Sequence, residues 1–381
     1  MEDTAENVRY LIKDSIKRQM DYNDEFGVLL SGGLDSSIIA KFASVFYRER
    51  TGMDLKTFSV DYKDQNENFK PTDFQPNKDD YYIDLMVNEL KTNHTRIILD
   101  SQDLVCSLED AMLARDYPGM ADVDTSYLEL FKRVNENANC VLSGECSDEI
   151  FGGYPWYFKE ELMNSGTFPW SNALDIRQKF IRKDFLKDID LIGYANGVYN
   201  SELNKLKFDD YETEESKKHK QLMYLTMNYF MQMLIDRTDR MCRYGHIDAR
   251  VPFCDYRIVE YAWNIPWEMK SYKGREKGLL RYSMEGYLPD EIIYRKKSPY
   301  PKTHNPDYLE KVLKLLKDIL NKDDCKIVQI LDKNYLEELV KNEGKFIEKP
   351  WFGQLMMGPQ LIAYFVQLEM WFERYNPKIE I

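Results

Sequence analysis

The amino-acid sequence predicts an α/β protein with a parallel sheet in its first part and a largely helical remainder. Three observations predict this class. Short apolar runs alternate with helical patterns before Tyr154, two of these runs end in glycine-containing turns, and helical spacing dominates afterwards. Strands that alternate with helices form right-handed β-α-β units, which place the strands parallel in one sheet. We expect residues 1–160 to form the core and 161–381 to be mostly helical, as a second part or as one continuous domain with the core.

The first elements follow from periodicity. An amphipathic helix opens the chain, with apolar residues at helical spacing: Val8, Leu11, Ile12, Ile16 and Met20. A strand over 28–30 leads through a turn into a second helix, and another strand covers 57–60. Residues 62–77 are polar, have no apolar period and contain two prolines, which predicts a surface loop.

The alternation continues to residue 142. A helix over 79–90 leads to a strand over 96–99, a helix over 103–115 follows, and a helix over 125–135 precedes a short apolar strand over 140–142. Further along, an apolar stripe at helical spacing predicts core packing rather than a ligand site; its residues are Met223, Met227, Phe230, Met231 and Leu234.

The turn after the first strand carries the strongest chemical signal, Ser31-Gly32-Gly33-Leu34-Asp35-Ser36-Ser37. Glycines let the backbone approach an anion closely, and serine hydroxyls with the free N–H groups of a helix N-terminus favour phosphate there. A carboxylate beside bound phosphates needs a cation between them, so Asp35 is a candidate Mg²⁺ ligand. No Gly-Lys-Ser/Thr follows, which excludes a Walker A loop.

This turn resembles the pyrophosphate-binding loop of the ATP pyrophosphatase (PP-loop) superfamily, whose members release pyrophosphate and adenylate their substrates. The resemblance implies an adenine nucleotide α-hydrolase-like core that binds ATP. It also implies two groups of binding residues: Ser31, Gly33, Ser36 and Ser37 for pyrophosphate, and the backbone near Leu30, Val60 and Gly144 for adenine and ribose. Ser143 is a further candidate for binding ATP or pyrophosphate.

A second glycine-containing turn follows the strand over 140–142, and it carries three carboxylates, in Ser143-Gly144-Glu145-Cys146-Ser147-Asp148-Glu149. Ligands bind outside the carboxyl ends of strands in open α/β sheets, so both turns can face one nucleotide. We expect Asp35 and Asp148 to share a Mg²⁺ ion, which leaves Glu145 free for chemistry. The alternative interpretation is an acidic helix start, where Asp and Glu complement the helix dipole.

Together the two turns resemble the synthetase domain of asparagine synthetases. The resemblance continues in that family's order to about residue 300, through 239–241, 248–255, 274–281 and 288–297. It implies that Lys297 neutralises charge on the phosphates in the transition state. It also implies that Glu145 takes a proton from the attacking nitrogen or holds ammonium. Arg275 and Lys277 are secondary candidates, because cationic side chains on such a helix mostly face solvent.

The resemblance implies ATP- and Mg²⁺-dependent amide formation, in which a carboxylate is adenylated, pyrophosphate leaves and ammonia attacks. Aspartate is the leading substrate and asparagine the leading product. The family's usual Thr-Thr-x-Arg segment is absent from residues 117–125, so an amidotransferase or cyclase acting on another carboxylate stays open. A nucleotide-binding subunit paired with a separate glutaminase stays open too. The related β-lactam synthetases have Tyr in place of Glu145, which favours an external amine here.

Composition limits which partners and which cellular location we expect for the protein. The net charge of −13 argues against nucleic acid, and so against tRNA modification. No signal peptide and no apolar run near the length of a membrane span are apparent, and the six cysteines show no paired spacing. We therefore expect a cytoplasmic location. Residue 2 is Glu2 and the first cysteine is Cys106, so we expect free ammonia or a separate glutaminase subunit to supply nitrogen; a homodimer stays open.

Overall fold

The computed structural model describes residues 1–20, 25–69, 78–210 and 212–380. Its centre is a five-stranded parallel sheet in the order β3-β2-β1-β4-β5. The strands are β1 (Phe26–Leu29), β2 (Lys56–Tyr62), β3 (Asn93–Leu99), β4 (Cys140–Leu142) and β5 (Asp248–Arg250). The predicted α/β class with a parallel sheet is confirmed.

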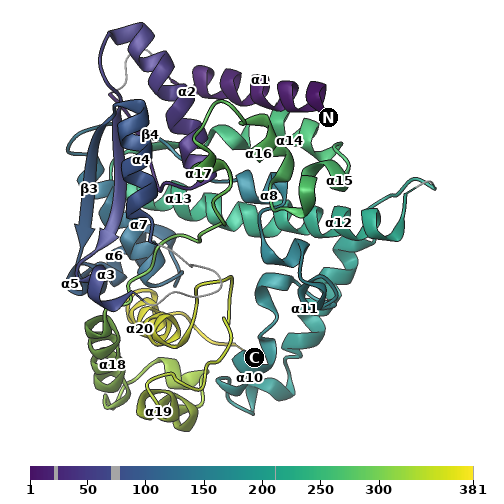
Figure 1. The fold of residues 1–381 in the computed structure, drawn as a ribbon. Helices are drawn as coiled ribbons and strands as arrows, with labels where there is room; N and C mark the ends of the chain where they lie inside the picture. Colours follow the sequence, from purple (N-terminus) through teal and green to yellow (C-terminus); the bar gives the residue numbers. More distant parts are fainter. Residues whose placement is uncertain (21–24, 70–77, 211, 381) are drawn as a thin grey trace.

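Helices cover both faces of this sheet (Figure 1). Successive residues of a strand point to opposite faces. In β4, Cys140 and Leu142 pack in one buried cluster, while Val141 packs in another. The first cluster includes α1 (Glu2–Gln19), α2 (Leu34–Thr51) and α4 (Asp80–Leu90). The second includes α5 (Ser101–Cys106), α6 (Leu108–Arg115) and α7 (Asp122–Val134).

The rest of the chain is helical, as expected. Short helices follow β4, namely α8 (Ser147–Phe151), α9 (Glu160–Met163) and α10 (Leu174–Lys179). Longer ones are α11 (Leu191–Leu203), α12 (Glu214–Leu225), a π-helical segment (Thr226–Met231) and α13 (Gln232–Tyr244). Beyond β5 come α14 (Tyr256–Trp263), α15 (Trp267–Lys270), α16 (Gly278–Ser283), α17 (Asp290–Ile293), α18 (Pro306–Leu320), α19 (Lys333–Lys341) and α20 (Gly358–Tyr375).

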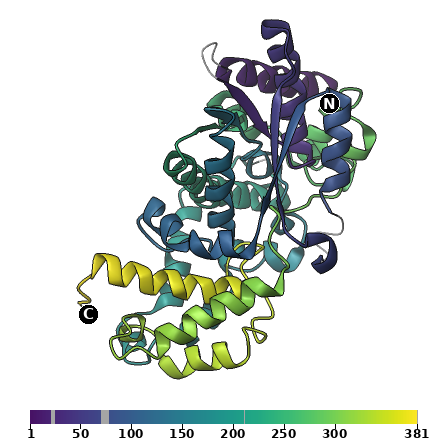
Figure 2. The same cartoon turned by 90° about the vertical axis from the view of Figure 1, so that its left-hand side faces the viewer.

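The C-terminal helices pack below the sheet, where α20 lies beside α18 and α18 contacts α5 (Figure 2). The predicted methionine stripe belongs to a third buried cluster, which is rich in aromatic side chains. Met223 and Phe230 are buried there, with Met227 and Leu234 packed against them. The prediction that this stripe is core is therefore confirmed.

Several predicted boundaries were wrong. The helix predicted over 103–115 is two helices separated by Ser107, and the first begins at Ser101 because Asp100 caps it with a reciprocal hydrogen-bond pair to Asp103. Strands β2 and β3 are longer than predicted, since β3 lies at the sheet edge, where its polar residues stay exposed. The loop predicted over 62–77 begins with the end of β2 and the short helix α3 (Gln65–Asn68); residues 70–77 lie outside the described residues.

None of the helices that the structure describes combines the length and apolar character that a bilayer crossing requires.

Candidate active site

A cavity of about 190 Å³ opens at the carboxyl ends of β1, β2 and β4. Parallel strands end at the same edge of a sheet, so the turns that follow them converge there. Ten of the predicted site residues line this cavity: Leu30, Ser31, Gly33, Asp35, Ser36, Val60, Ser143, Gly144, Glu145 and Asp148. The structure thus brings both glycine-containing turns to one place.

The first turn is held by its own serines. The Ser31 backbone N–H donates to the Ser36 hydroxyl over 3.1 Å, and this hydroxyl donates to the Gly33 carbonyl oxygen over 3.2 Å. Gly32 has a φ of 67°, and a Cβ there would lie 2.7 Å from a backbone nitrogen of α4. Ser37 is completely buried and does not line the cavity. The geometry therefore supports Ser31 and Ser36, rather than Ser37, as groups that face a ligand.

The second turn lies directly against the first. A Cβ added to Gly144 would lie 2.8 Å from the Ser36 backbone nitrogen and 3.1 Å from the Asp35 Cβ. Only a glycine lets the two backbones approach this closely. Ser147 adds a hydrogen bond of 2.6 Å from its hydroxyl to an Asp35 carboxylate oxygen.

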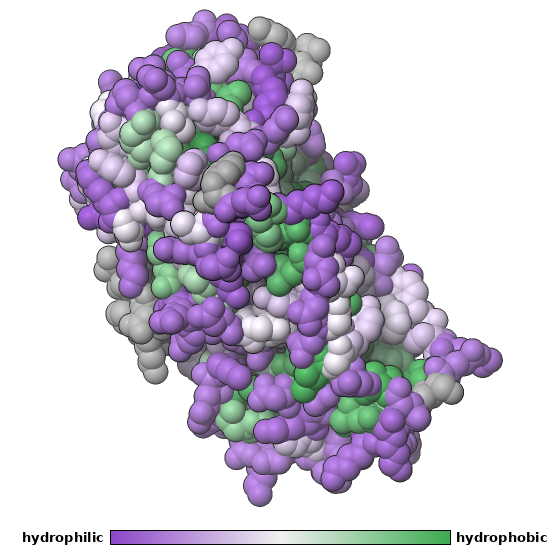
Figure 3. Space-filling model, turned by 90° about the vertical axis from the view of Figure 1, so that its right-hand side faces the viewer, coloured by the Kyte–Doolittle hydropathy of each residue, from purple (hydrophilic) through white to green (hydrophobic). Residues whose placement is uncertain are grey.

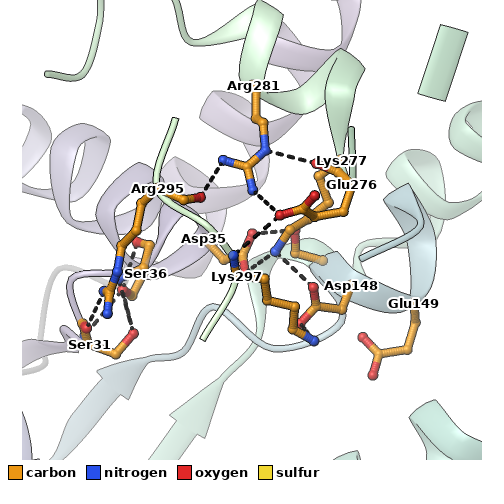
Figure 4. Close-up of polar contacts among 12 residues, drawn as sticks. Ser31, Asp35, Ser36, Asp148, Glu149, Glu276, Lys277, Arg281, Arg295 and Lys297 are labelled. Atoms are coloured by element: carbon orange, nitrogen blue, oxygen red, sulfur yellow. Dashed lines mark hydrogen bonds and ion pairs between the residues drawn. The ribbon is translucent and has the colours of Figure 1, made fainter. Parts of the chain in front are cut away.

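A buried lysine lies between the two aspartates that were predicted to share a metal (Figure 4). Lys277 Nζ is 2.7 Å from Asp35 Oδ2 and 2.8 Å from Asp148 Oδ1, and Lys277 is only 2% exposed. Burial alone would lower its pKa, but the two carboxylates outweigh burial and raise the pKa of Lys277 above its ordinary value. The expectation that Lys277 mostly faces solvent was wrong.

Lys297 contacts the same aspartate from the other side. Its Nζ is 2.9 Å from Asp148 Oδ2 and 3.9 Å from the centre of the Tyr154 ring. Burial favours a raised pKa for Asp148, yet the ammonium groups of Lys277 and Lys297 hold the pKa of that carboxyl well below its usual range. Asp148 is thus ionised between two cations. Lys297 does not line the 190 Å³ cavity but a neighbouring cavity of about 440 Å³.

Asp35 and Asp148 can supply two oxygen ligands to Mg²⁺, which prefers oxygen and usually keeps waters and substrate phosphates as its other ligands. Their convergence on one ammonium nitrogen places carboxylate oxygens of both residues within 3 Å of a common point. No group of three or more Asp, Glu, His or Cys side chains that suits a metal occurs in the described residues. The residues therefore fit a metal that bound phosphates help to hold, and not a site formed by protein alone.

Glu145 is clamped at the cavity wall. One carboxylate oxygen, Oε1, accepts hydrogen bonds from Arg237 (2.7 Å) and the Tyr127 hydroxyl (3.1 Å). The other, Oε2, accepts one of 2.6 Å from the Thr238 hydroxyl. The Arg237 guanidinium also lies 4.5 Å from the centre of the Tyr127 ring. These contacts fix the carboxylate while leaving it on the cavity wall.

Arg295, which contacts the first glycine-containing turn, was not predicted from the sequence as a residue of the site. Arg295 is 8% exposed, forms an ion pair with Asp79 and donates to the Ser31 carbonyl oxygen over 3.4 Å. Its guanidinium lies 3.9 Å from the centre of the Tyr82 ring. Arg295 also lines the 190 Å³ cavity. Its local sequence gave no indication of these contacts, because Asp79 and Ser31 are distant in sequence.

The segment that lacks the usual Thr-Thr-x-Arg pattern is held by arginines from other helices. Arg115 donates to Asp124 over 3.1 Å in a fully buried pair. Arg237 lies between Met120 and Glu145. Burial raises the pKa of Asp122, in the same segment, to about 6. Two buried guanidinium groups thus contact residues 117–125, although the local sequence of this segment gives no sign of them.

Comparison with known proteins gives the chain its relatives. The family model described as asparagine synthase matches residues 7–373. Glutamine-hydrolyzing asparagine synthetase 3 of Bacillus subtilis is 44% identical over 379 residues, which is 100% of this chain and 61% of that protein. Asparagine synthetase 1 of the same organism is 24% identical over 341 residues. The enzyme of Rattus norvegicus is 24% identical over 308 residues. The chain spans 61%, 49% and 43% of these three relatives.

Proposed function

The chain belongs to the asparagine synthase family, and from that premise we propose that it forms an amide bond by adenylating a carboxylate with ATP. Aspartate is the proposed substrate, ammonia the nucleophile, and asparagine, AMP and pyrophosphate the products. The relatives are named asparagine synthetases. The observation that carries the proposal is the convergence of both turns on one cavity, with Lys277 between Asp35 and Asp148.

In the first step a carboxylate oxygen of the substrate attacks the α-phosphorus of ATP, and the bond to the bridging oxygen of the β-phosphate breaks. Negative charge builds on the departing pyrophosphate. The Ser31–Ser36 turn offers backbone N–H and hydroxyl groups to it, and Lys277 and Lys297 offer fixed positive charge. Preorganised charge of this kind acts in the transition state, because it does not have to reorient.

A Mg²⁺ ion held by Asp35, Asp148 and the phosphates would supply Lewis-acid stabilisation of the same charge. The ammonium of Lys277 lies where both carboxylates converge. We infer that Lys277 keeps the two carboxylates together and shares them with the metal when ATP is bound.

In the second step the ammonia nitrogen attacks the acyl carbon, the carbon–oxygen bond to AMP breaks, and one proton must leave the nitrogen. Glu145 is the carboxylate on the cavity wall that can accept it. Its hydrogen bonds from Arg237, Tyr127 and Thr238 fix its position. We infer that Glu145 acts at the nitrogen step, with Arg237 and Thr238 as positioning residues.

A second function within the same chemistry is adenylation of another carboxylate, followed by attack of another amine. It is favoured by the absence of the usual Thr-Thr-x-Arg segment from residues 117–125. A role as a synthetase-like subunit that pairs with a separate glutaminase also fits the relatives, whose names include glutamine hydrolysis and whose chains are longer.

A substrate panel tests the proposal. The purified chain is incubated with ATP, Mg²⁺, ammonium and single carboxylates, aspartate first, and pyrophosphate release is measured. We expect carboxylate-dependent release with aspartate and an equal amount of amide. Pyrophosphate release with another acid, and not with aspartate, would identify a different substrate for the same adenylation reaction. Carboxylate-independent hydrolysis of ATP to ADP would refute the proposed function.

A further inference from the structure

A second cavity, of about 290 Å³, lies between α12 and the segment from Trp263 to Lys270. The face of the molecule on this side shows separate hydrophobic patches on a mainly hydrophilic surface (Figure 3). The cavity shares no lining residue with the proposed ATP cavity. Trp267 separates it from the catalytic turn, because a Cβ added to Gly152, just after α8, would lie 2.6 Å from the Trp267 ring.

The cavity has a buried cation that the proposed reaction does not use. Lys270 is 3% exposed, and its Nζ has one close polar neighbour, the Met223 sulfur at 3.0 Å. Within the described part of the chain, no carboxylate pairs with Lys270. A thioether is a weak acceptor and cannot compensate an ammonium for lost water. A buried lysine that lines a cavity without an anionic partner indicates that the partner comes from outside the chain.

The other charged groups around the cavity are already engaged or face solvent. Lys220 pairs with Glu212 over 2.7 Å. The ring nitrogens of His219 lie 2.9 and 3.2 Å from two backbone carbonyl oxygens, and the ring stacks on Trp267. Glu268 is exposed. Burial, with a smaller contribution from Lys220, lowers the pKa of Lys270 to about 7. Near neutral pH the Lys270 amine is therefore only partly protonated, and an anion bound beside it would favour the ammonium form.

The lining of the cavity mixes apolar and polar residues. The apolar ones are Met223, Trp263, Ile265, Pro266 and Trp267, and the polar or charged ones besides those already described are Thr213, Ser216 and Asn264. Binding sites for small organic molecules combine an apolar wall with a few convergent polar groups that orient the ligand. One buried ammonium against such a wall suits one negative charge attached to an apolar body.

We propose that this cavity binds a small organic carboxylate, whose anionic group pairs with Lys270 and whose apolar body packs against Trp263, Ile265 and Trp267. The site is distinct from the ATP cavity, and the proposal does not depend on the proposed reaction. Binding gives an anionic partner to a nitrogen that has none among the residues the structure describes. It also draws a proton onto Lys270, because pairing with an anion favours the ammonium form.

Isothermal titration calorimetry with benzoate as the probe tests this proposal. Benzoate carries one carboxylate on a flat apolar ring, and benzamide is its neutral counterpart. We expect saturable one-to-one binding of benzoate and at least tenfold weaker binding of benzamide. Titrations at pH 7.5 in two buffers of different ionisation enthalpy should reveal net uptake of protons when benzoate binds, because pairing with the anion favours the ammonium form of Lys270. Binding without proton uptake would contradict pairing with Lys270.

Variants localise the binding. Lys270→Met should weaken benzoate binding at least tenfold and abolish the proton uptake. Lys273→Met is the matched control, since Lys273 is exposed, lies three residues away and does not line the cavity; its benzoate affinity should be unchanged. Equal affinity of the Lys270→Met variant and the original chain would overturn the proposal. So would inorganic phosphate binding as tightly as benzoate, because an apolar body would then contribute nothing.

Discussion

Lys277 contributes the charge that holds the two catalytic turns together. It contacts one aspartate from each turn and is almost fully buried. Removal of one partner from a buried charge cluster is strongly destabilising, because the remaining charges lose their compensation. In the proposed first step, this ammonium offers positive charge beside the turns that would hold pyrophosphate. Lys277 therefore links the stability of the site to the proposed first step.

The Lys277→Met variant tests this link. We expect kcat for pyrophosphate release to fall by roughly 100-fold or more, and the free energy of unfolding to fall by about 3–5 kcal/mol. Arg275→Met is the control, since Arg275 is exposed two residues earlier; its effect on unfolding should be within about 0.5 kcal/mol. Urea unfolding and a pyrophosphate assay provide both numbers. A Lys277→Met variant with normal kcat would exclude Lys277 from the first step.

Glu145 separates the two proposed steps. In the Glu145→Gln variant the side chain keeps its size but cannot take a proton from nitrogen. We expect amide formation to fall more severely than carboxylate-dependent pyrophosphate release, so that the ratio of amide to pyrophosphate drops below one. Both products are measured in the same reaction. Equal losses of the two products would assign Glu145, with Arg237, to organisation of the adenylation site instead.

Site residues in distinctive local motifs could be predicted from the sequence, whereas residues whose partners are distant in sequence could not. Asp35, Asp148 and Glu145 could be predicted because each follows an apolar strand in a distinctive turn. Lys277 was undervalued, because a lysine on a helix is usually solvated and only the fold reveals which carboxylates it meets. Arg295 and Arg237 were missed for the same reason: their partners Asp79 and Glu145 are far away in sequence.

At the scale of elements, the active site depends on how closely two strand-to-helix turns approach. The Ser143-Gly144 turn after β4 packs against the N-terminus of α2 with no room for a side chain. The two turns meet because β4 lies next to β1 in the sheet, so the turns that follow these strands are neighbours. The packing of these two turns thus sets the distance between Asp35 and Asp148.

Gly144→Ala tests this contact. A Cβ would lie 2.8 Å from the Ser36 backbone nitrogen, so the turns must move apart. We expect ATP affinity and pyrophosphate release to fall at least tenfold while the circular dichroism spectrum stays that of a folded protein. Gly197→Ala, on α11, is the control, because a Cβ there meets nothing within 4 Å; an alanine there should preserve activity and stabilise the protein slightly. Unchanged ATP binding in Gly144→Ala would contradict the proposed role of the turn.

Four of the five strands were predictable as elements, the edge strand β3 among them, whereas the edge strand β5 was not. β1 and β4 are short apolar runs because both faces of a parallel sheet are covered by helices. β5 is only three residues long, and none of them is fully buried, so its sequence carries no apolar period. It forms because the backbone of Asp248–Arg250 pairs with β4. Pairing between distant segments leaves no local signal.

At the scale of the whole molecule, Lys270 makes stability depend on pH. Its pKa is about 7 in the folded chain and 10.5 in the ordinary state. Between these values the unfolded chain binds more protons, so the free energy of unfolding rises with pH across this window. The charged or titratable groups around Lys270 are Lys220 and His219 on α12, Glu268 on α15 and Glu212 just before α12, and Lys220 already has Glu212 as its carboxylate partner.

Lys270→Met removes the cost of burying this charge. We expect the variant to be more stable than the original chain by about 2–4 kcal/mol at pH 6, and the gain to shrink as the pH approaches 10. Urea unfolding at pH 6, 7.5 and 9.5 measures it, with Lys273→Met as a control whose effect should not vary with pH. A gain that is constant across this range would mean that Lys270 does not titrate as its burial implies.

The central claim is that ATP is used to adenylate a carboxylate, and an oxygen label tests it most directly. When ammonia displaces AMP from an acyl-adenylate, one oxygen of the substrate carboxylate leaves with the AMP phosphate. The purified chain is supplied with ATP, ammonium and aspartate labelled with ¹⁸O in both carboxylates, or with the acid identified by the substrate panel, and the nucleotide products are analysed by mass spectrometry. We predict one ¹⁸O atom in AMP for each amide formed and none in pyrophosphate. Label in inorganic phosphate, accompanied by ADP, would contradict the account.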